Sequence, residues 1–269
     1  MKTHLITGAA SGIGFELARV LLARGDAVLA CDINTAPMEP LRAHAAAPGH
    51  LELRRLDVRD PAQWEQLMRE AAQLWPRLDT VMNIAGVLRP SSALDIAPAD
   101  IDLHFDVNTK GVILGTQAAI RLMRNQSDSN GRGHIINMAS MSALTGVPGI
   151  ALYAASKFAV RGYSLSLVHE LRRQGIFLTV ICPAAVSTPL VEPYKHRSEA
   201  ALLFIAPLLT VEQLVRAIIG RVMVRRPIEL TLPRRRGLLA KVAGSFPSVA
   251  SLLVGSMTRT GLRNQARLK

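Results

Sequence analysis

The sequence predicts an α/β fold in which one parallel sheet of seven strands is covered by helices on both faces. Short apolar runs alternate with segments of helical periodicity from residue 2 to residue 232, and this alternation is typical of right-handed βαβ crossovers. A glycine-rich turn follows the first apolar run, and no linker interrupts the alternation. We therefore expect a single domain over residues 1–233, followed by a basic helical extension over residues 234–269.

Seven apolar runs are predicted to be strands, namely residues 2–7, 27–31, 51–56, 78–82, 134–139, 176–181 and 228–232. Helices are predicted over residues 15–24, 101–123, 152–172 and 210–224, with a further helix starting at Pro61. Proline suits the first position of a helix, and Thr210 with Gln213 matches a capping box. The extension reads as two short amphipathic helices broken near Pro247.

The net charge of +12 is concentrated at one end of the chain. Residues 221–269 contain eleven Lys or Arg and a single acid, Glu229, whereas the first 220 residues carry only +2. This distribution argues against a catalytic domain that holds nucleic acid, so we expect no nucleic-acid partner. An apolar content of 49% indicates a packed globular protein.

Metal chemistry and membrane-spanning segments are not expected from this sequence. Cys31 and Cys182 lie in apolar runs and read as buried thiols, and the seven histidines have no metal-ligand spacing. The longest uncharged runs, residues 133–156 and 242–258, contain Ser, Pro and Gly, and no signal peptide is evident. We expect a cytoplasmic protein.

The first turn has the features of a dinucleotide-binding turn. Gly8, Gly12 and Gly14, with Ser11 and Ile13 between them, stand between a predicted strand and a predicted helix. Glycines let the backbone approach a pyrophosphate, which is stabilised at the helix N-terminus. The alternative is a plain strand–helix turn.

Asp32 ends the second predicted strand, 18 residues after Gly14. A carboxylate at this distance accepts hydrogen bonds from the adenosine ribose hydroxyls and repels a 2′-phosphate. Neither Ser11 nor Ile33 supplies a cation for that phosphate. We therefore predict NAD(H) rather than NADP(H), with a loop carboxylate that caps a helix as the alternative.

Ser140, Tyr153 and Lys157 form the candidate catalytic group. Tyr153 and Lys157 are four residues apart in a predicted helix and therefore share one face. A nearby ammonium group lowers the pKa of a phenol. Ser140 ends a predicted strand, from which its hydroxyl can return over the Tyr153 ring. The group suits carbonyl/alcohol redox chemistry, although an ordinary surface pair on a helix has the same spacing.

In this order and spacing, the chain resembles the short-chain dehydrogenase/reductase family from residue 3 to about residue 190, and more weakly to about residue 232. The motifs that carry the resemblance are Thr7-Gly8-x-x-x-Gly12-x-Gly14, Asp57, Asn83-x-Ala85-Gly86, Asn108, Ser140, Tyr153-x-x-x-Lys157, and Pro183 with Thr188. The resemblance implies a Rossmann-type fold and an oxidoreductase that transfers a hydride between a nicotinamide cofactor and a substrate.

The resemblance also implies a role for each matching residue. Tyr153 would be the general acid/base, Ser140 would hold the substrate oxygen, and Lys157 would tune Tyr153 and bind the nicotinamide ribose. Asn108 would hold a water that links Lys157 to solvent. The expected cofactor contacts are Asp57 and Val58 at the adenine, Asn83, Ala85 and Gly86 along the cleft, and Pro183, Val186 and Thr188 near the carboxamide.

Three departures from the family pattern affect these expectations. Ile84 replaces a frequent second Asn, and Ala184 replaces a usual Gly after Pro183. Many members also end with an Asp-Gly-Gly stretch that packs in a tetramer, which this chain lacks. We therefore expect a homodimer, formed through the helices at residues 101–123 and 152–172, rather than a tetramer.

Apolar residues surround the expected substrate position, and those singled out are Met141, Leu144, Ile150 and Leu190. This lining predicts a lipophilic secondary alcohol or ketone, for example a long-chain, retinoid- or steroid-like molecule. Some of these residues could instead be core or dimer contacts. In the extension, the apolar residues are Leu238, Leu239, Val242, Phe246, Val249, Leu252 and Leu253. We expect their face to pack on the domain, with peripheral contact to a membrane surface as the alternative.

Other functions remain open from the sequence. An NADP-dependent carbonyl reductase or a 3-oxoacyl reductase fits the same fold, although Asp32 and the missing Asp-Gly-Gly stretch argue against it. A non-catalytic NAD(H)-binding sensor is a different class, but such proteins tend to lose the tyrosine or the lysine. A serine hydrolase is weaker still, because Ser140 lacks the nucleophile-elbow glycines.

Overall fold

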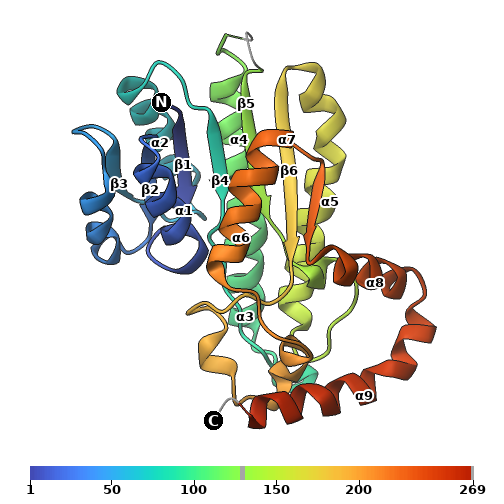
Figure 1. The fold of residues 1–269 in the computed structure, drawn as a ribbon. Helices are drawn as coiled ribbons and strands as arrows, with labels where there is room; N and C mark the ends of the chain where they lie inside the picture. Colours follow the sequence, from blue (N-terminus) through green and yellow to red (C-terminus); the bar gives the residue numbers. More distant parts are fainter. Residues whose placement is uncertain (128–130, 268–269) are drawn as a thin grey trace.

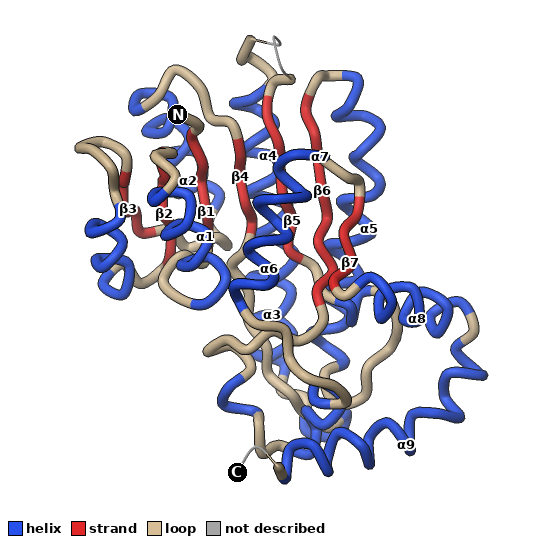
Figure 2. The backbone as a smooth tube through the Cα atoms, in the orientation of Figure 1, coloured by secondary structure: helices blue, strands red, loops and turns tan. Residues whose placement is uncertain are grey.

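The computed structural model describes residues 1–127 and 131–267, and its centre is one sheet of seven parallel strands (Figures 1 and 2). The strand order is β3-β2-β1-β4-β5-β6-β7. The strands are β1 (Thr3–Thr7), β2 (Ala27–Asp32), β3 (Leu51–Arg55), β4 (Thr80–Asn83), β5 (Gly133–Met138), β6 (Ile176–Pro183) and β7 (Glu229–Leu232). Every strand lies within two residues of its predicted run, so the predicted fold class is confirmed.

Two layers of helices cover the sheet. On one face, α1 (Gly12–Ala23) and α6 (Val211–Ala217) contribute Leu17, Leu21 and Leu214 to the core. On the other face, α2 (Pro61–Leu74), α4 (Gly111–Met123) and α5 (Ala151–Arg173) contribute residues such as Trp64 and Val168. In Figure 1, α6 lies in front of the sheet and α4 and α5 lie behind it. Because both faces are covered, inner strands such as β2 and β6 are mostly apolar, whereas the edge strand β3 contains Glu52, Arg54 and Arg55.

The strand order reverses between β1 and β4. From β1 the chain builds outward through β2 to β3, and it then returns to place β4 on the other side of β1. The loops that leave the ends of these two strands therefore diverge and open a crevice at the sheet edge. Ligands of open parallel sheets bind at such a switch point.

The predicted start of α2 is confirmed in detail. Asp60 caps this helix by accepting hydrogen bonds from the backbone N–H groups of Ala62 (2.8 Å) and Gln63 (3.3 Å), and Pro61 occupies the first turn. Thr210 and Gln213 form the predicted capping box of α6. Both helix starts follow from local sequence alone.

Two predicted helices are interrupted by π-helical turns. The segment predicted as one helix over residues 101–123 consists of α3 (Pro98–His104), the π-helix η3 (Phe105–Lys110) and α4. The segment predicted over residues 210–224 consists of α6, the π-helix η7 (Ile218–Val222) and α7 (Met223–Arg225). Short 3₁₀ helices occupy the connections: η1 (Ala36–His44), η2 (Ala93–Asp95), η4 (Met141–Ala143), η5 (Glu192–Tyr194) and η6 (Ser198–Phe204).

The extension contains α8 (Arg234–Ser245) and α9 (Pro247–Ala266), as predicted from the break near Pro247. Residues 268–269 of the predicted extension lie outside the described residues. Together α8 and α9 form the terminal arc, which leaves the end of β7 and curves back below the sheet (Figure 1). We use this name for residues 234–266 below.

The terminal arc is attached to the domain at its two ends. Near its start, Lys241 forms an ion pair with Glu229, which also pairs with Arg161 at 2.6 Å. Near its end, Asn264 Nδ2 donates a hydrogen bond to the Phe204 carbonyl oxygen (2.8 Å) and Gln265 Nε2 donates one to that of Arg197 (2.9 Å). The last turns of α9 therefore pack on η6.

The apolar side chains of the arc remain in solvent. The exposed residues include all seven singled out from the sequence: Leu238, Leu239, Val242, Phe246, Val249, Leu252 and Leu253. Leu252 is 81% exposed, and no residue between Ser245 and Thr260 is buried. The expectation that this apolar face packs on the domain is therefore wrong, because the arc touches the domain through other residues. Within the described part of the chain, no helix has the length and apolar character needed to cross a membrane.

Candidate active site

The glycine turn lies at the switch point between β1 and β4. Gly8 and Gly12 adopt φ values of +69° and +52°, which favour glycine. A Cβ on Gly14 would lie only 2.2 Å from the Gly8 carbonyl oxygen, so a larger residue would not fit there. The turn consequently presents backbone and the N-terminus of α1 to the crevice, an arrangement that suits an anionic phosphate.

Thr7 connects this turn to the end of β4. Its Oγ1 accepts hydrogen bonds from the backbone N–H groups of Ile84 (3.0 Å) and Ala85 (3.2 Å). A Cβ on Gly8 would lie 2.9 Å from the Ala85 Cα, so the two backbones are in close contact. Ala85 and Gly86 are thereby held beside the glycine turn, where they line the crevice.

Asp32 is at the end of β2 and is tied to the same turn. Its Oδ2 accepts a hydrogen bond from the Ala10 N–H (3.1 Å), and its Oδ1 accepts one from the Asn34 N–H (3.1 Å). The carboxylate lines the crevice, as the sequence predicts. It therefore also has a structural role, because it holds the glycine turn to the second strand.

Asp57 and Val58 follow β3 and also line the crevice. The Arg59 guanidinium binds both carboxylate oxygens of Asp57, at 2.9 Å and 2.6 Å. This interaction lowers the pKa of Asp57 below its usual value, chiefly through the side-chain hydrogen bond. The Val58 carbonyl oxygen accepts a hydrogen bond from the Trp64 indole (3.0 Å), which fixes the loop.

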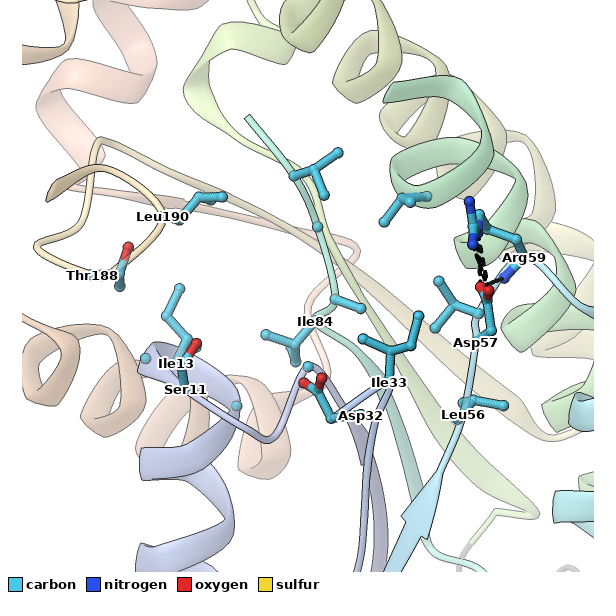
Figure 3. Close-up of a pocket in the computed structure, with 18 of the residues that line it drawn as sticks. Ser11, Ile13, Asp32, Ile33, Leu56, Asp57, Arg59, Ile84, Thr188 and Leu190 are labelled. Atoms are coloured by element: carbon cyan, nitrogen blue, oxygen red, sulfur yellow. Dashed lines mark hydrogen bonds and ion pairs between the residues drawn. The ribbon is translucent and has the colours of Figure 1, made fainter. Parts of the chain in front are cut away.

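These groups surround an outer cavity of about 350 Å³. Figure 3 shows Asp32 and Ile33 between the glycine turn and Asp57, with Thr188 and Leu190 across the cavity. The outer cavity is lined by the predicted cofactor residues Gly8, Ser11, Gly12, Ile13, Gly14, Asp32, Asp57, Val58, Ala85, Gly86 and Thr188. Residues from five separate segments of the chain thus share one elongated site.

Ser140, Tyr153 and Lys157 line an adjoining inner cavity of about 100 Å³. Ser140 follows β5, and its Oγ accepts a hydrogen bond from the Ser142 N–H (3.2 Å). Tyr153 and Lys157 lie in the first two turns of α5, with Lys157 Nζ 5.7 Å from the centre of the Tyr153 ring. Lys157 Nζ also donates a hydrogen bond to the Met138 carbonyl oxygen (2.9 Å). The structure therefore brings the three candidate catalytic residues together.

Burial controls the ionisation of this group. It raises the pKa of Tyr153 to about 12, while the interaction with Ser140 acts in the opposite direction. Burial also lowers the pKa of Lys157 to about 8. The expected lowering of the Tyr153 pKa by Lys157 is therefore not what the structure shows, because desolvation of the phenol dominates.

Asn108 is completely buried in η3, where the wider π-helical turn carries its side chain toward the site. Its Oδ1 accepts a hydrogen bond from the Val87 N–H (2.8 Å), and its Nδ2 donates to Ser156 Oγ (3.0 Å). A Cβ on Gly86 would lie 3.1 Å from Asn108 Oδ1 and 3.5 Å from Lys157 Nζ. Both polar groups therefore approach the same glycine.

Pro183 at the end of β6 and Ala184, Val186 and Thr188 in the following loop close the inner cavity. A Cβ on Gly12 would lie 3.2 Å from Thr188 Cγ2, so this loop meets the glycine turn. The two cavities are continuous, because both are lined by Ile13, Ile84, Gly86, Thr188 and Leu190. A single cleft thus runs from Asp57 to Tyr153.

Asn83 does not line the cleft as expected. Its Nδ2 donates a hydrogen bond to Asn137 Oδ1 (2.8 Å), and it belongs to a buried polar cluster with Thr116 between β4, β5 and α4. Its amide nitrogen has partners in the core, although its buried Oδ1 accepts no hydrogen bond from the described residues. Asn83 therefore joins secondary structure elements beneath the site.

Three of the four predicted substrate residues are also placed elsewhere. Leu144 and Ile150 are buried in separate core clusters, at 5% and 1% exposure, and Met141 packs beside the cluster of Leu144. The short helix η4 starts immediately after Ser140, and none of these three residues lines either cavity. Leu190 is the predicted substrate residue that lines the cleft.

Several cleft residues were missed by the sequence analysis. They are Ile33, Leu56, Arg59, Ile84, Val87, Leu103 and Val107 in the outer cavity, and Leu88, Met138, Ala139, Ala184 and Ala185 in the inner cavity. The position of Arg59, two residues after Asp57, was a usable signal for their ion pair. The apolar residues left no such signal in the sequence, because the loops that carry them come together only in the folded chain. Among the described residues, no group of His, Cys, Asp and Glu side chains could hold a metal ion.

The arrangement of this cleft is typical of enzymes that act on CH–OH groups with nicotinamide cofactors. Comparison with known proteins identifies the family. The model of the short chain dehydrogenase family matches residues 2–199, so the chain belongs to this family of oxidoreductases. Oxidoreductase UcpA of Salmonella typhimurium is 36% identical over 199 residues, which cover 73% of this chain and 74% of that protein.

A second relative is the 3-alpha-(or 20-beta)-hydroxysteroid dehydrogenase of Mycobacterium tuberculosis, 34% identical over 191 residues that cover 71% of each chain. Among solved structures, levodione reductase superposes with a TM-score of 0.78 at 23% identity. That match covers 88% of this chain and 98% of the other, and it shows the shared fold.

Proposed function

We propose that the protein is an NAD(H)-dependent oxidoreductase that interconverts a lipophilic secondary alcohol and its ketone. The observation that carries this proposal is the continuous cleft, which has a glycine turn and Asp32 at one end and Ser140, Tyr153 and Lys157 at the other. A dinucleotide fits the outer cavity, because the glycine turn leaves backbone room for the pyrophosphate and the end of β2 presents a carboxylate. A bound nicotinamide cofactor supplies or receives the hydride.

The chain's own residues handle the proton and the substrate oxygen. In ketone reduction, Tyr153 donates its phenolic proton to the substrate oxygen while the Ser140 hydroxyl donates a hydrogen bond to the same atom. In alcohol oxidation, Tyr153 accepts the hydroxyl proton. Tyr153 must therefore be a phenolate before alcohol oxidation, and it is left as a phenolate by ketone reduction. The protonated Lys157 ammonium stabilises this phenolate, and Asn108 beside Gly86 orients a water on the proton path to solvent.

The preference for NAD(H) rests on charge in the outer cavity. Among the described residues that line it, Arg59 is the single cation, and its guanidinium is engaged by both oxygens of Asp57. A 2′-phosphate beside the Asp32 carboxylate would therefore meet repulsion without a compensating cation. The ribose hydroxyls of NAD(H) instead offer donors to Asp32.

The lipophilic substrate is supported by the walls of the inner cavity. Apart from Ser140, Tyr153, Lys157 and Thr188, the lining side chains are apolar or absent, and they include Leu88, Met138, Leu190, Val191 and Leu203. An apolar pocket with a few convergent polar groups selects apolar ligands. The hydroxysteroid dehydrogenase among the relatives is named for a substrate of this kind.

We also propose a homodimer formed through α5 and the neighbouring α3–η3 segment. Three large apolar residues are exposed on these elements: Ile101, Phe105 and Phe158, at 41%, 37% and 43%. Thr109 Oγ1 donates a hydrogen bond to the Ser156 carbonyl oxygen (3.1 Å), which joins η3 to α5. Exposed aromatic residues on adjoining helices are characteristic of protein interfaces.

The decisive experiment combines cofactor titration with a matched pair of tyrosine variants. We expect NADH to bind more tightly than NADPH by nicotinamide fluorescence, and a panel of cyclic or long-chain secondary alcohols to turn over faster than short polar hydroxy acids. Tyr153→Phe should reduce kcat by about 10²–10⁴-fold with little change in NADH affinity. Tyr163→Phe, on the same helix but outside the cleft, is the control and should retain activity.

Each outcome separates the competing functions. Tighter NADPH binding would overturn the cofactor preference and support an NADP-dependent carbonyl or 3-oxoacyl reductase. NADH binding without turnover of any panel member would support the non-catalytic sensor. Equal activity of Tyr153→Phe and Tyr163→Phe would contradict the assignment of Tyr153 as the acid/base.

A further inference from the structure

The terminal arc contains a long uncharged and exposed stretch. Residues 242–258, which we call the apolar stretch, contain no Asp, Glu, Lys or Arg. Phe246, Val249 and Leu253 within it are 61%, 62% and 58% exposed, and none of residues 245–260 is buried. An exposed apolar patch of this kind indicates a surface that contacts something else.

The apolar side chains of α9 have the spacing of one helix face. Val249, Leu252, Leu253 and Met257 occur at intervals of three, one and four residues, so they project from the same side. Phe246, at the break between α8 and α9, and Val242, before the break, are also exposed, at 61% and 51%. The arc therefore presents apolar side chains to solvent on both sides of the break.

Exposed cations flank the apolar stretch on both sides. Arg234 and Arg235 precede it, Arg259 and Arg263 follow it, and Arg267 stands immediately after the arc. All five side chains are exposed. The sequence contains no acid after Glu229, and that carboxylate is engaged by Arg161 and Lys241. The surface of the arc is therefore apolar at its centre and strongly positive at its ends.

This charge pattern favours an anionic lipid surface over a second copy of the chain. Two arcs in contact would place ten like charges near one interface, whereas anionic headgroups neutralise the same arginines. The uncharged aromatic patch of Phe105 and Phe158 is better suited to contact between copies. Basic residues around an exposed apolar helix face are characteristic of peripheral binding at the headgroup boundary.

We propose that the terminal arc docks on the surface of an anionic bilayer, with the apolar stretch inserted at the headgroup–acyl boundary and the flanking arginines on the phosphates. The docking does not depend on the proposed reaction. It does have a consequence for that reaction, because α9 packs on η6 and Leu203 of η6 lines the inner cavity. The docked enzyme would hold this wall of its substrate site close to the lipid.

The test is co-sedimentation of the full chain with vesicles of phosphatidylcholine alone or mixed with phosphatidylglycerol. We expect binding to the mixed vesicles, little binding to phosphatidylcholine alone, and release by salt. Leu252→Asp/Leu253→Asp and Arg259→Glu/Arg263→Glu should each weaken binding by about tenfold or more. The matched controls are Val224→Asp, an exposed apolar residue on α7, and Arg172→Glu/Arg173→Glu at the end of α5, and both should bind like the wild type.

Thermal unfolding and light scattering complete the experiment. All variants change exposed residues, so they should retain the Tm of the wild type. Absence of binding to the mixed vesicles, or equal binding by Leu252→Asp/Leu253→Asp and Val224→Asp, would overturn the proposal. If Leu252→Asp/Leu253→Asp still binds vesicles but has a lower molar mass than the wild type, the arc would instead be a contact surface between two copies of the chain.

Discussion

At the scale of single residues, the Tyr153–Lys157 pair shows how burial sets the chemistry of the site. Both groups are shifted toward their neutral forms, since the pKa of the phenol rises to about 12 and that of the ammonium falls to about 8. A neutral phenol is a competent proton donor, which suits ketone reduction. Alcohol oxidation requires the phenolate, so its rate should rise with pH.

The depressed pKa of Lys157 predicts a stability effect. The pKa of Lys157 is about 8 in the folded protein and has its ordinary value of 10.5 in the unfolded chain. Between pH 8 and pH 10.5, Lys157 is therefore mostly neutral in the folded protein but still mostly protonated in the unfolded chain. This contribution to stability is fully present above pH 10.5 and is lost as the pH falls through 8. Relative to Lys157→Met, wild-type stability should rise by up to about 1.4 kcal/mol per pH unit in this window.

Urea unfolding of both proteins from pH 7 to pH 10 measures this difference. Lys110→Met, at an exposed lysine, is the matched control for the loss of a lysine side chain and is measured over the same pH range. If the difference between wild type and Lys157→Met stays constant across the window, Lys157 has an ordinary pKa in the folded protein.

The residues that line the site could be predicted where a local sequence motif marks them. They could not be predicted where contacts with distant segments determine how a side chain points. The glycine turn, Asp32, Ser140 and Tyr153 depend on spacing within one segment. The inward orientation of Asn83 depends on Asn137 in a neighbouring strand, and strand adjacency is not contained in the spacing. The same reason accounts for Leu144, whose apolar character fits a pocket wall and a core position equally well.

At the scale of elements, α4 and α5 contain glycines with opposite effects on packing. A Cβ on Gly115 of α4 would lie 2.3 Å from Asn83 Oδ1 and 2.7 Å from the Trp64 ring, whereas a Cβ on Gly162 of α5 would meet nothing within 4 Å. Helix α4 therefore approaches the sheet as closely as it does because Gly115 has no side chain. Gly162, by contrast, faces solvent and only weakens its helix.

These two glycines predict opposite changes in stability. Gly115→Ala should lower the free energy of unfolding by about 1–3 kcal/mol through overpacking. Gly162→Ala should raise it by about 0.5–1 kcal/mol, because alanine favours the helix. Chemical denaturation of both variants checks this, and a loss of stability for Gly162→Ala would contradict the packing of α5 described above.

Secondary structure elements were predicted well where a short pattern of apolar residues marks them. All seven strands appear because apolar runs between turn residues are short and distinct. The π-helices η3 and η7 were not predicted, because an i→i+5 turn leaves little trace in an apolar pattern of helical period. Within η3, Asn108 forms hydrogen bonds with Val87 and Ser156.

At the scale of the whole molecule, we propose a different binding partner for each of the two exposed apolar surfaces. The proposed dimer uses Phe158 and its neighbours, and the proposed lipid contact uses the apolar stretch. Phe158→Asp should convert a dimer into a monomer, because it places a charge at the centre of the aromatic patch. Phe246→Asp, the same change on the arc, should leave the molar mass unchanged.

Size-exclusion chromatography with light scattering measures both variants. A Phe158→Asp protein with the molar mass of the wild type would contradict this dimer surface. The sequence predicted the helices of this interface and the two helices of the arc. The exposure of the arc was not predicted, because an amphipathic face does not reveal whether protein, lipid or solvent covers it.

The pairing of β1 with both β2 and β4 also has a kinetic consequence. His4 pairs locally in sequence with Val28 but distantly with Thr80. During synthesis, one edge of β1 must therefore wait until β4 has left the ribosome, while the βαβ unit of β1, α1 and β2 can form earlier. Parallel pairing over such distances folds slowly and exposes strand edges to aggregation. Slower translation at reduced temperature should therefore raise the yield of folded protein.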